Sequence, residues 1–348
     1  MPDSEVRIGV VGAGANTRRF HIPGFQKIDG VEVVSVVNRS RESSERVAGE
    51  FKIPRTCDDW HELVADDDTN AIMIGTWPYL HCPVTLAALA AGKHVLTEAR
   101  MAMNASEARQ MLTASRGRPD LVAMVVPSPF TFAVDRTIQE LIGEGYLGEI
   151  LAIDLHAGGP GFMDAGGPLS WRQDRALSGD NIMFMGIWYE ALMRWVGEAT
   201  RVMARAKVAP RMRKDPDTGQ ERAVRVPDHL EVIADMACGA VARIQVSNVT
   251  GLAPATGAWL YGSQGTLHYD HVAGRLSGGR RGAGSLEEIA VAPEKRGGWR
   301  VEEEFIGAIR GAEPVRLTTF QDGVQYMEFT SAVTQSLASD TAVAIPMS

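Results

Sequence analysis

The chain has 348 residues, of which 45% are hydrophobic and 22% charged, and its formal net charge is −8. This composition is typical of a globular protein long enough for two domains, and it excludes a disordered chain. The one short basic run, residues 211–214, borders acidic residues and is expected to be a solvated loop, so we expect no nucleic-acid partner. No apolar run approaches the length that crosses a bilayer, so we expect no membrane partner either.

The three cysteines, Cys57, Cys82 and Cys238, lie far apart in the sequence and form neither a CxxC pair nor a metal-binding spacing. An odd number of cysteines argues against a disulfide framework. We therefore predict free thiols and no metal site. The first residues enter a strand at once, without the pattern of a signal peptide, and the expected location is the cytoplasm.

The first third of the chain alternates short apolar runs with helical patterns. Strands are predicted at 7–11, 31–37, 71–76, 94–97 and 121–126. Helices are predicted at 17–27 (interrupted near Pro23), 43–51, 82–91 and 106–115. This spacing predicts right-handed crossovers and a parallel sheet covered on both faces. Residues 1–125 are therefore predicted to form an α/β domain of the Rossmann type, with a doubly wound parallel sheet.

The pattern changes after about residue 125. Helices are predicted at 132–144, 181–196, 301–310 and 321–338. Strands are predicted at 149–157, 202–207, 229–236, 241–249 and 257–261. Runs that alternate apolar and polar residues are typical of antiparallel strands with one covered face. Residues 126–348 are therefore predicted to form an α+β domain with an open, mostly antiparallel sheet. Loops are expected at 158–168 and 274–298, and the second of these contains a short strand-like run at 288–291.

A glycine turn links the first strand to the first helix, with Gly12 and Gly14 followed by Ala15 and Asn16. In a dinucleotide fingerprint the first glycine permits a tight turn, and the second lets the backbone approach the pyrophosphate. The third glycine of the pattern is replaced by Thr17. The position of the turn nevertheless predicts a bound nicotinamide dinucleotide.

The second predicted strand ends in Asn38-Arg39-Ser40-Arg41. An acidic residue at its end would accept hydrogen bonds from the adenosine ribose and select NAD. Asn38 is uncharged, and Arg39 and Arg41 are able to pair with a 2′-phosphate, unless they are exposed loop residues near the adenine. We therefore predict NADP as the cofactor, with NAD as the alternative.

Nearly the whole chain resembles the Gfo/Idh/MocA family of sugar and cyclitol oxidoreductases. The matching stretches are the Gly12 turn and residues 76–81, 91–98, 145–150, 171–172, 262–267 and 304–311. The resemblance implies that Thr76, Trp77, His81 and Glu98 lie near the cofactor. His81 is also suited to fixing its loop through a backbone hydrogen bond.

Two motifs of the family are altered in this chain. Family members typically carry Glu-Lys-Pro after the fourth strand, whereas this chain reads Glu98-Ala99-Arg100. Arg100 is too basic to replace the lysine in proton transfer and is predicted to bind substrate. The family also carries Asp-x-Gly-x-His, with the histidine as general base, where this chain has Phe184 and Trp188.

Four other side chains are candidates for proton transfer: Tyr189, Glu190, His156 and Asp174. Tyr189 is equally suited to the core with a hydrogen bond at its tip. Glu190 is suited to an ion pair with Arg194 at i, i+4.

Aromatic faces suit the CH-rich faces of sugar rings. We therefore predict that Trp171 and Trp188 bind substrate, although both are equally suited to a core. The resemblance implies a substrate contact for Arg172 as well. The leading hypothesis is an NAD(P)-dependent oxidoreductase that acts on a CH–OH group of a sugar, cyclitol or related polyol, with a non-standard proton relay.

Two alternatives stay open. One is a cofactor-retaining lyase or glycoside hydrolase with no net redox change, and the other is a non-catalytic dinucleotide-binding protein. The resemblance also implies a homodimer or homotetramer formed through the second-domain sheet, around residues 229–249.

Overall fold

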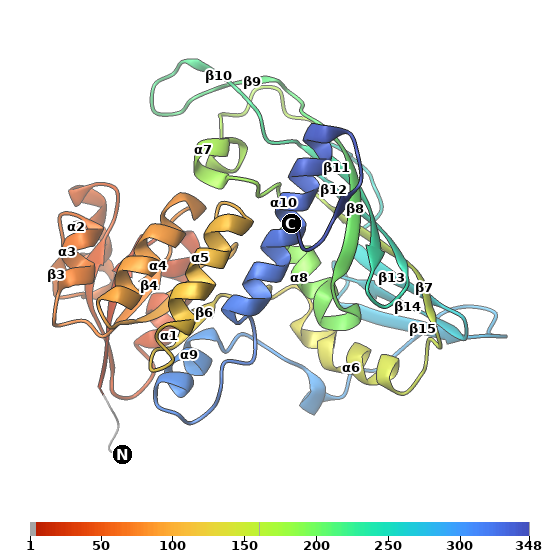
Figure 1. Ribbon diagram of the computed structural model, residues 1–348, viewed down its shortest axis with the longest axis horizontal. Coiled ribbons are helices and arrows are strands. Elements are labelled where there is room, and N and C mark those ends of the chain that lie inside the picture. Colours follow the sequence, from red (N-terminus) through yellow and green to blue (C-terminus); the bar gives the residue numbers. More distant parts are fainter. Residues whose placement is uncertain (1–4, 160, 348) are drawn as a thin grey trace. The chain divides into compact units, whose positions relative to one another are not determined.

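The computed structural model describes residues 5–159 and 161–347 (Figure 1). The chain divides into two compact units: residues 5–127 with Arg300–Met327, and Ser128–Trp299 with residues 328–347. The sequence places the boundary after residue 125 and assigns Arg300–Met327 to the second domain, whereas the structure groups this segment with the first unit. This segment pairs with the last strand of the first unit, where Val125 N–H donates a hydrogen bond to Thr318 O at 3.0 Å.

The first unit is built on a six-stranded parallel sheet with strand order β3-β2-β1-β4-β5-β6. Its strands are β1 (Val6–Val11), β2 (Val31–Val37), β3 (Arg55–Thr56), β4 (Ala71–Ile74), β5 (His94–Thr97) and β6 (Ala123–Val125). This order confirms the predicted Rossmann sheet. The chain runs outward from β1 in one direction and from β4 in the other, so their carboxyl ends meet at the switch point where open α/β sheets bind ligands.

Helices cover both faces of this sheet, because right-handed crossovers that leave β1 and β4 in opposite directions place their helices on opposite sides. The helix predicted at 17–27 is instead a π-helical turn, η1 (Thr17–His21), followed by the short α1 (Ile22–Phe25). The remaining helices are α2 (Arg41–Phe51), α3 (Trp60–Ala65), η2 (Pro78–Leu80), α4 (His81–Ala90), α5 (Ala105–Arg116) and α9 (Val301–Ile309). The sequence pattern misses α3, which is too short to show a clear helical period.

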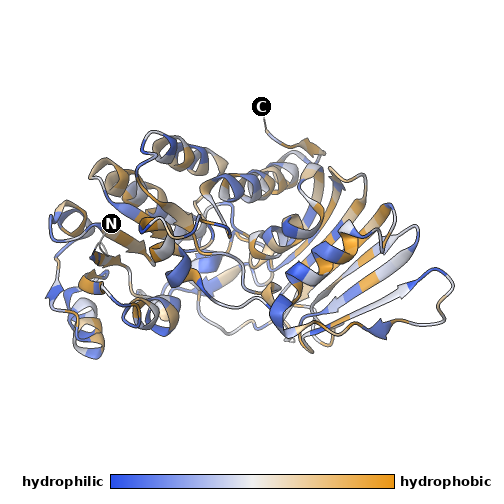
Figure 2. Ribbon diagram, turned by 90° about the horizontal axis from the view of Figure 1, so that it is seen from below, coloured by the Kyte–Doolittle hydropathy of each residue, from blue (hydrophilic) through white to orange (hydrophobic). Residues whose placement is uncertain are grey.

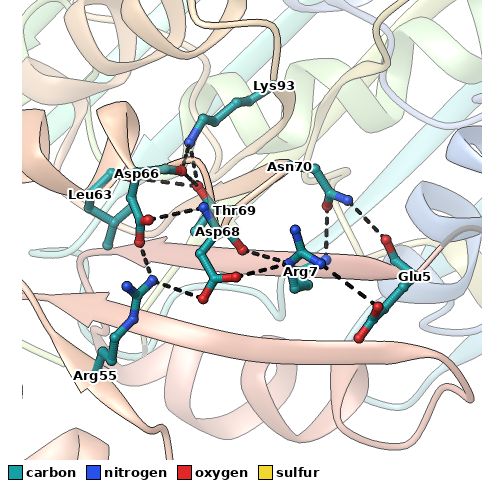
Figure 3. Close-up of polar contacts among 9 residues, drawn as sticks. All are labelled: Glu5, Arg7, Arg55, Leu63, Asp66, Asp68, Thr69, Asn70 and Lys93. Carbon is teal, nitrogen blue, oxygen red and sulfur yellow. Dashed lines mark hydrogen bonds and ion pairs between the residues drawn. The ribbon is translucent and has the colours of Figure 1, made fainter.

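Polar contacts at the amino ends of the strands tie several segments of the first unit together (Figure 3). Arg55 pairs with Asp66 and, at 3.3 Å, with Asp68. Lys93 is only 5% exposed, and its ammonium group donates to the Asp66 carbonyl oxygen and, at 2.5 Å, to the Thr69 hydroxyl. These charges therefore hold the framework together at the end of the sheet opposite to the switch point.

The second unit contains a nine-stranded sheet with strand order β16-β15-β14-β13-β7-β12-β11-β8-β17. Among its described strands only β7 and β12 pair in parallel, so the sheet is mixed and mostly antiparallel, which confirms the predicted fold class. Its strands are β7 (Ile150–Gly158), β8 (Ala199–Lys207), β11 (His229–Met236), β12 (Val241–Ser247), β13 (Gly257–Gly262), β14 (Gly265–Asp270), β15 (Arg275–Arg280), β16 (Glu287–Glu288) and β17 (Val343–Ala344). A separate ribbon consists of β9 (Met212–Lys214) and β10 (Glu221–Ala223).

One face of this sheet is covered and the other is open. Buried and accessible residues alternate along β11, and Figure 2 shows hydrophobic and hydrophilic residues succeeding one another along these strands. The helices of this unit are α6 (Phe132–Gly143), η3 (Trp171–Gln173), α7 (Arg175–Ser178), α8 (Met185–Val196), η4 (Pro293–Lys295) and the later part of α10 (Phe320–Ser339). In the part of the chain that the structure describes, no helix is long and apolar enough to cross a membrane.

Residues 275–280 form strand β15, whereas their glycine content predicts a loop. A Cβ atom on Gly278 would lie 2.7 Å from the Cδ1 atom of Ile289, so glycine here permits close packing of a neighbouring side chain. The pattern of the sequence cannot distinguish this use of glycine from its use in a turn.

The basic run at residues 211–214 is also not the solvated loop that the sequence predicts. Arg213 is 9% exposed, and its guanidinium donates to the carbonyl oxygens of Gly167 and Asp164 at 2.7 Å and 2.8 Å. Arg213 thus holds the Gly/Pro-rich segment that follows β7.

Candidate active site

A cavity of about 490 Å³ lies at the carboxyl ends of β1, β2 and β4 in the first unit. Each of these strands continues into a loop that lines it, and residues 58–60 complete the wall. The lining residues include Gly12, Ala13, Gly14, Asn38, Arg39, Asp58, Asp59, Trp60, Gly75, Thr76, Trp77 and Tyr79. The cavity therefore lies at the switch point, where the glycine turn predicts the dinucleotide.

The glycine turn at Gly12 packs against a further glycine, Gly75, which the sequence pattern does not indicate. Gly12 has φ +85°, and a Cβ atom on it would lie 2.5 Å from Thr76 Cγ2. Thr17, in place of the third glycine, is 1% exposed, and its hydroxyl donates to Gly12 O at 3.3 Å. The room for this hydroxyl comes from Gly75, on which a Cβ atom would lie 2.0 Å from Thr17 Oγ1. In the usual pattern the third glycine allows the helix to pack closely on the strand. Here Thr17 takes its place, and Gly75, its packing partner, provides the room instead.

The Asn38 side chain joins the glycine turn to α2. Its amide oxygen accepts a hydrogen bond from Ala13 N–H at 2.7 Å, and its amide nitrogen donates to the carbonyl and hydroxyl oxygens of Ser43 at 3.2 Å and 3.1 Å. Asn38 therefore lines the cavity with its polar atoms already engaged by the protein, and it does not replace the acidic residue that accepts ribose hydroxyls in NAD-selective sites.

The two predicted arginines of this loop lie in different places. Arg39 lines the cavity, and its guanidinium lies 5.8 Å from the ring centroid of Trp77. Arg41 is not among the lining residues; its side chain is 75% exposed and pairs with Glu45 at 2.9 Å, one helical turn along α2. Ala15 and Asn16 are exposed at the start of η1, next to the lining residue Gly14.

His81 is fully buried at the start of α4. Its ring nitrogens lie 3.0 Å from Thr76 O and 2.9 Å from Arg100 O. Burial lowers the pKa of this imidazole, so at neutral pH it donates one hydrogen bond and holds the loop that carries Thr76. Arg100 itself is 3% exposed. We assign His81 to positioning the loop, whereas Arg100 contributes only its main-chain carbonyl to this contact and its role in substrate binding stays a prediction.

Glu98, at the carboxyl end of β5, belongs to a buried cluster of three charged groups. Its Oε1 atom lies 3.2 Å from His21 Nε2, and the Nδ1 atom of the same imidazole lies 2.5 Å from Glu302 Oε1 on α9. Burial is the largest influence and opposes the charge on Glu98, but the hydrogen bond and the positive charge of His21, together with the Ala99 N–H, outweigh it and lower the pKa of the carboxyl group. His21 was not singled out from the sequence, because no local spacing relates it to residues 98 and 302.

In the second unit, Tyr189 and Glu190 are engaged in structural contacts. Tyr189 is fully buried, its ring stacks on Phe329, and its hydroxyl accepts a hydrogen bond from Ala199 N–H at 2.7 Å. Glu190 is 3% exposed and pairs with Arg194 at 3.0 Å, which is the i, i+4 alternative that the sequence offered. Burial raises the pKa of Tyr189, so it is a poor proton acceptor, and we assign proton transfer to neither residue.

Asp174 caps a helix. Its side chain accepts the N–H of Ala176 at 3.0 Å at the start of α7 and pairs with Arg222 at 2.8 Å. Each carboxylate oxygen of Asp174 thus has a partner within the protein, and we do not assign proton transfer to this residue.

His156 lies on the open face of the sheet. Leu155 is buried and pairs across the sheet with Ala258, which pairs with Tyr269, a residue that contacts Trp195 of α8. Because neighbouring residues of a strand point to opposite faces, His156 points away from α8 and from Trp188. His156 is therefore not placed to act in the region where the resemblance locates the base.

Trp188, which stands where the resemblance places the base, lies in an aromatic cluster. Its side chain is 3% exposed, and its ring centroid lies 5.1 Å from those of Phe130 and His271. His271 follows β14, and its Nδ1 atom lies 3.1 Å from Phe130 O. In the neutral form, donation by Nδ1–H to this carbonyl leaves Nε2 as a proton acceptor. Burial lowers the pKa of His271, which favours that neutral form.

A second cavity, of about 260 Å³, lies within the second unit. Arg172 and Phe184 line it together with Ser170, Gln173, Asn248 and other residues of the same unit. The Arg172 guanidinium lies 4.3 Å from the ring centroid of Trp171, which is not among the lining residues. Donors and acceptors beside the exposed Phe184 side chain suit a ligand with several hydroxyl groups. In the described residues no group of three or more His, Cys, Asp or Glu side chains is placed to hold a metal ion.

Two family models match the chain. Residues 6–125 match the model described as "Oxidoreductase family, NAD-binding Rossmann fold", and residues 136–268 match the "GFO/IDH/MocA C-terminal domain". The two matches fall one in each unit.

Three known proteins illustrate the similarity. The 1,5-anhydro-D-fructose reductase of Ensifer adhaerens is 36% identical over 42% of this chain and 43% of its own length. The D-xylose 1-dehydrogenase [NADP(+)] of Haloarcula marismortui is 28% identical over 65% of this chain and 61% of its own length. Both matches thus span less than two thirds of the relative. A solved levoglucosan dehydrogenase in complex with NADH and levoglucosan has a TM-score of 0.85 at 21% identity, covering 98% of this chain and 100% of that one.

The packing around Gly75 predicts that Gly75→Ala abolishes binding of the dinucleotide. The added Cβ atom would lie 2.0 Å from Thr17 Oγ1 and 2.2 Å from Gly12 O, so the glycine turn itself must move. Titration of tryptophan fluorescence with NADPH and NADH measures the loss. Gly49→Ala is the matched control, because a Cβ atom on Gly49 meets nothing within 4 Å, and it is expected to bind like the wild type. Unchanged affinity in Gly75→Ala would contradict the role given to this contact.

Proposed function

The chain belongs to the Gfo/Idh/MocA family of oxidoreductases, and we propose that it is an NAD(P)-dependent oxidoreductase acting on an alcohol group of a sugar, cyclitol or related polyol. The observation that carries this proposal is the glycine-lined cavity of about 490 Å³ at the switch point. Glycine at positions 12 and 75 lets the two loops approach each other so closely that backbone groups line the cavity, which fits a backbone cradle for a pyrophosphate. The names of the relatives support a carbohydrate substrate.

The phosphorylated cofactor is favoured by the adenosine end of the cavity. Arg39 offers a cation at the wall of the cavity, and Asn38 offers no carboxylate to a ribose. Arg41 contributes less than the sequence suggests, because Glu45 and, at 3.9 Å, Asp58 already neutralise it. We therefore propose NADP as the preferred cofactor on the strength of Arg39 alone.

One assay tests both the reaction and the cofactor. We expect a change in nicotinamide absorbance with at least one member of a panel of sugars, cyclitols and polyols, and a lower Kd for NADPH than for NADH. Tighter binding of NADH would contradict the cofactor preference. If product forms without net consumption of the cofactor, the protein is a redox-neutral lyase or glycoside hydrolase and not a dehydrogenase. If the cofactor binds but no product forms, the protein is a non-catalytic dinucleotide-binding protein.

His271 is our candidate for the proton acceptor. A nicotinamide, when bound, would supply the hydride acceptor, and a residue of the chain would accept the proton of the alcohol oxygen. The tautomer of His271 is set by Phe130 O, its pKa is lowered by burial, and its ring contacts Trp188, at the position where the resemblance implies a histidine. None of Tyr189, Glu190, His156 and Asp174 combines these properties.

His271→Gln is expected to lower kcat/KM by about 10²–10⁴-fold, which is the usual contribution of a positioned base, and to leave the Kd of the cofactor unchanged. In the wild type, the rate of alcohol oxidation should fall as the pH drops below the ordinary histidine pKa, because protonated His271 cannot accept a proton. The control is His268→Gln, which removes a histidine stacked on Trp259 at 3.8 Å on the open face. Equal rates in His271→Gln and the control would eliminate His271 as the base.

The open face of the second-unit sheet is proposed to pair subunits into a homodimer or homotetramer. Met203, Ile233 and Val241 are 42%, 49% and 49% exposed on β8, β11 and β12, which is unusual for large apolar side chains on adjoining strands. Light scattering of the purified protein should therefore give a mass of two or four chains, and Ile233→Lys should lower it. A monomeric mass for the wild type would contradict this assembly.

A further inference from the structure

The cluster of Glu98, His21 and Glu302 joins three segments of the first unit that are far apart in the sequence. His21 ends η1, the π-helical turn that directly follows the glycine turn. Glu98 follows β5, and its backbone N–H donates to Ile74 O at 2.9 Å, next to the lining residue Gly75. Glu302 lies in the first turn of α9. The cluster therefore connects the two loops that carry Gly12 and Gly75 to a third element of the unit.

The geometry favours a protonated imidazole between two ionised carboxylates. Both ring nitrogens of His21 face carboxylate oxygens, at 2.5 Å for Glu302 and 3.2 Å for Glu98. Ionised carboxylates only accept hydrogen bonds, and imidazole donates from both nitrogens only as the cation. Glu98 has a further donor, since its Oε2 atom accepts Ala99 N–H at 3.1 Å. The cation thus satisfies two buried carboxylates at once.

The surrounding chain makes room for this cluster. His21 is completely buried, and Glu98 and Glu302 are 8% and 2% exposed. A Cβ atom on Gly24 would lie 2.7 Å from Glu302 Cγ, so glycine in α1 allows the carboxylate of α9 to reach the imidazole. Buried charges are costly unless they are paired, and a pairing supported in this way by three segments holds those segments in register.

We propose that His21 is a positioning residue whose positive charge holds the glycine turn against β5 and α9, so that dinucleotide affinity depends on the proton that His21 carries. This inference rests on the proposed function. When the proton is lost, two carboxylates are left buried beside a neutral ring, and their repulsion both loosens η1 and disfavours the negatively charged pyrophosphate.

The direction of the pH effect follows from the same contacts. Burial alone would lower the pKa of His21, but the hydrogen bonds with Glu302 and Glu98 outweigh it and raise the pKa to about 9. The carboxylates of Glu302 and Glu98 both face this imidazole. Because its folded-state pKa is raised, charged His21 stabilises the folded arrangement fully below the unfolded-state pKa of about 6.5. This stabilisation is lost as the pH rises through about 9. Affinity should therefore be constant near neutral pH and fall at alkaline pH.

The test measures the Kd of NADPH and NADH by fluorescence between about pH 7 and about pH 10. In the wild type, binding should weaken by about tenfold for each pH unit above the pKa of His21. His21→Gln should bind weakly at every pH and lose this dependence. Glu302→Gln should shift the fall toward lower pH, because it removes one of the carboxylates that stabilise the cation. His94→Gln, at the opposite end of β5, is the control and should follow the wild type.

A second measurement needs no variant and does not depend on cofactor binding. In the ¹⁵N–¹H spectrum of the wild type at about pH 7.5, both ring nitrogens of His21 should carry protons, as expected for a group with a raised pKa. A neutral ring at that pH would overturn the proposal, as would a His21→Gln variant that keeps the wild-type pH dependence. If the ring is protonated but no dinucleotide binds at any pH, the proposed function is wrong. The effect of His21 on dinucleotide affinity is then also wrong, whereas the positive charge on His21 is confirmed.

Discussion

The close approach of three backbone segments at the ends of β1, β2 and β4 is the constraint on which the cofactor end of the first unit depends. Gly12 N–H donates to Val37 O and Gly75 N–H donates to Val11 O, each at 2.8 Å. These bonds extend the parallel pairing of the strands by one step into the loops. A Cβ atom on either glycine would collide with the backbone of the other loop, so the cavity wall is built from peptide groups at a distance that side chains do not permit.

This constraint also shows what the sequence was able to predict. The alternation of apolar runs and helical patterns was sufficient for the Rossmann sheet, because fully buried parallel strands and their crossover helices leave a strong periodic signal. The compensation of Thr17 by Gly75 was not predictable in the same way. It depends on which residues of β1 and β4 become neighbours, and a sequence pattern describes only neighbours along the chain. The same reason explains why Gly278 was misinterpreted, since its packing partner Ile289 belongs to another segment.

The candidate site was predicted less completely than the fold, because residue type does not reveal how a titratable group is used. Glu190 is an example. It accepts Ser128 N–H at 3.0 Å and pairs with Arg194, whose guanidinium also pairs with Asp135 at 2.9 Å. A buried carboxylate satisfied in this way belongs to the packing of the second unit. Only the three-dimensional partners distinguish this use from catalysis.

His271 illustrates the complementary case. Its Nδ1 atom is fixed by Phe130 O, and burial lowers the pKa of the ring in spite of the neighbouring Asp270, which favours the neutral form. His21 differs in that both of its ring nitrogens lie near carboxylate oxygens, which raises its pKa and favours the cation. The two histidines thus acquire opposite protonation states from their acceptors, a carbonyl in one case and carboxylates in the other. A chain with Ala99 and Trp188 at the positions where the resemblance implies lysine and histidine therefore still contains one imidazole suited to hold charge and one suited to accept a proton.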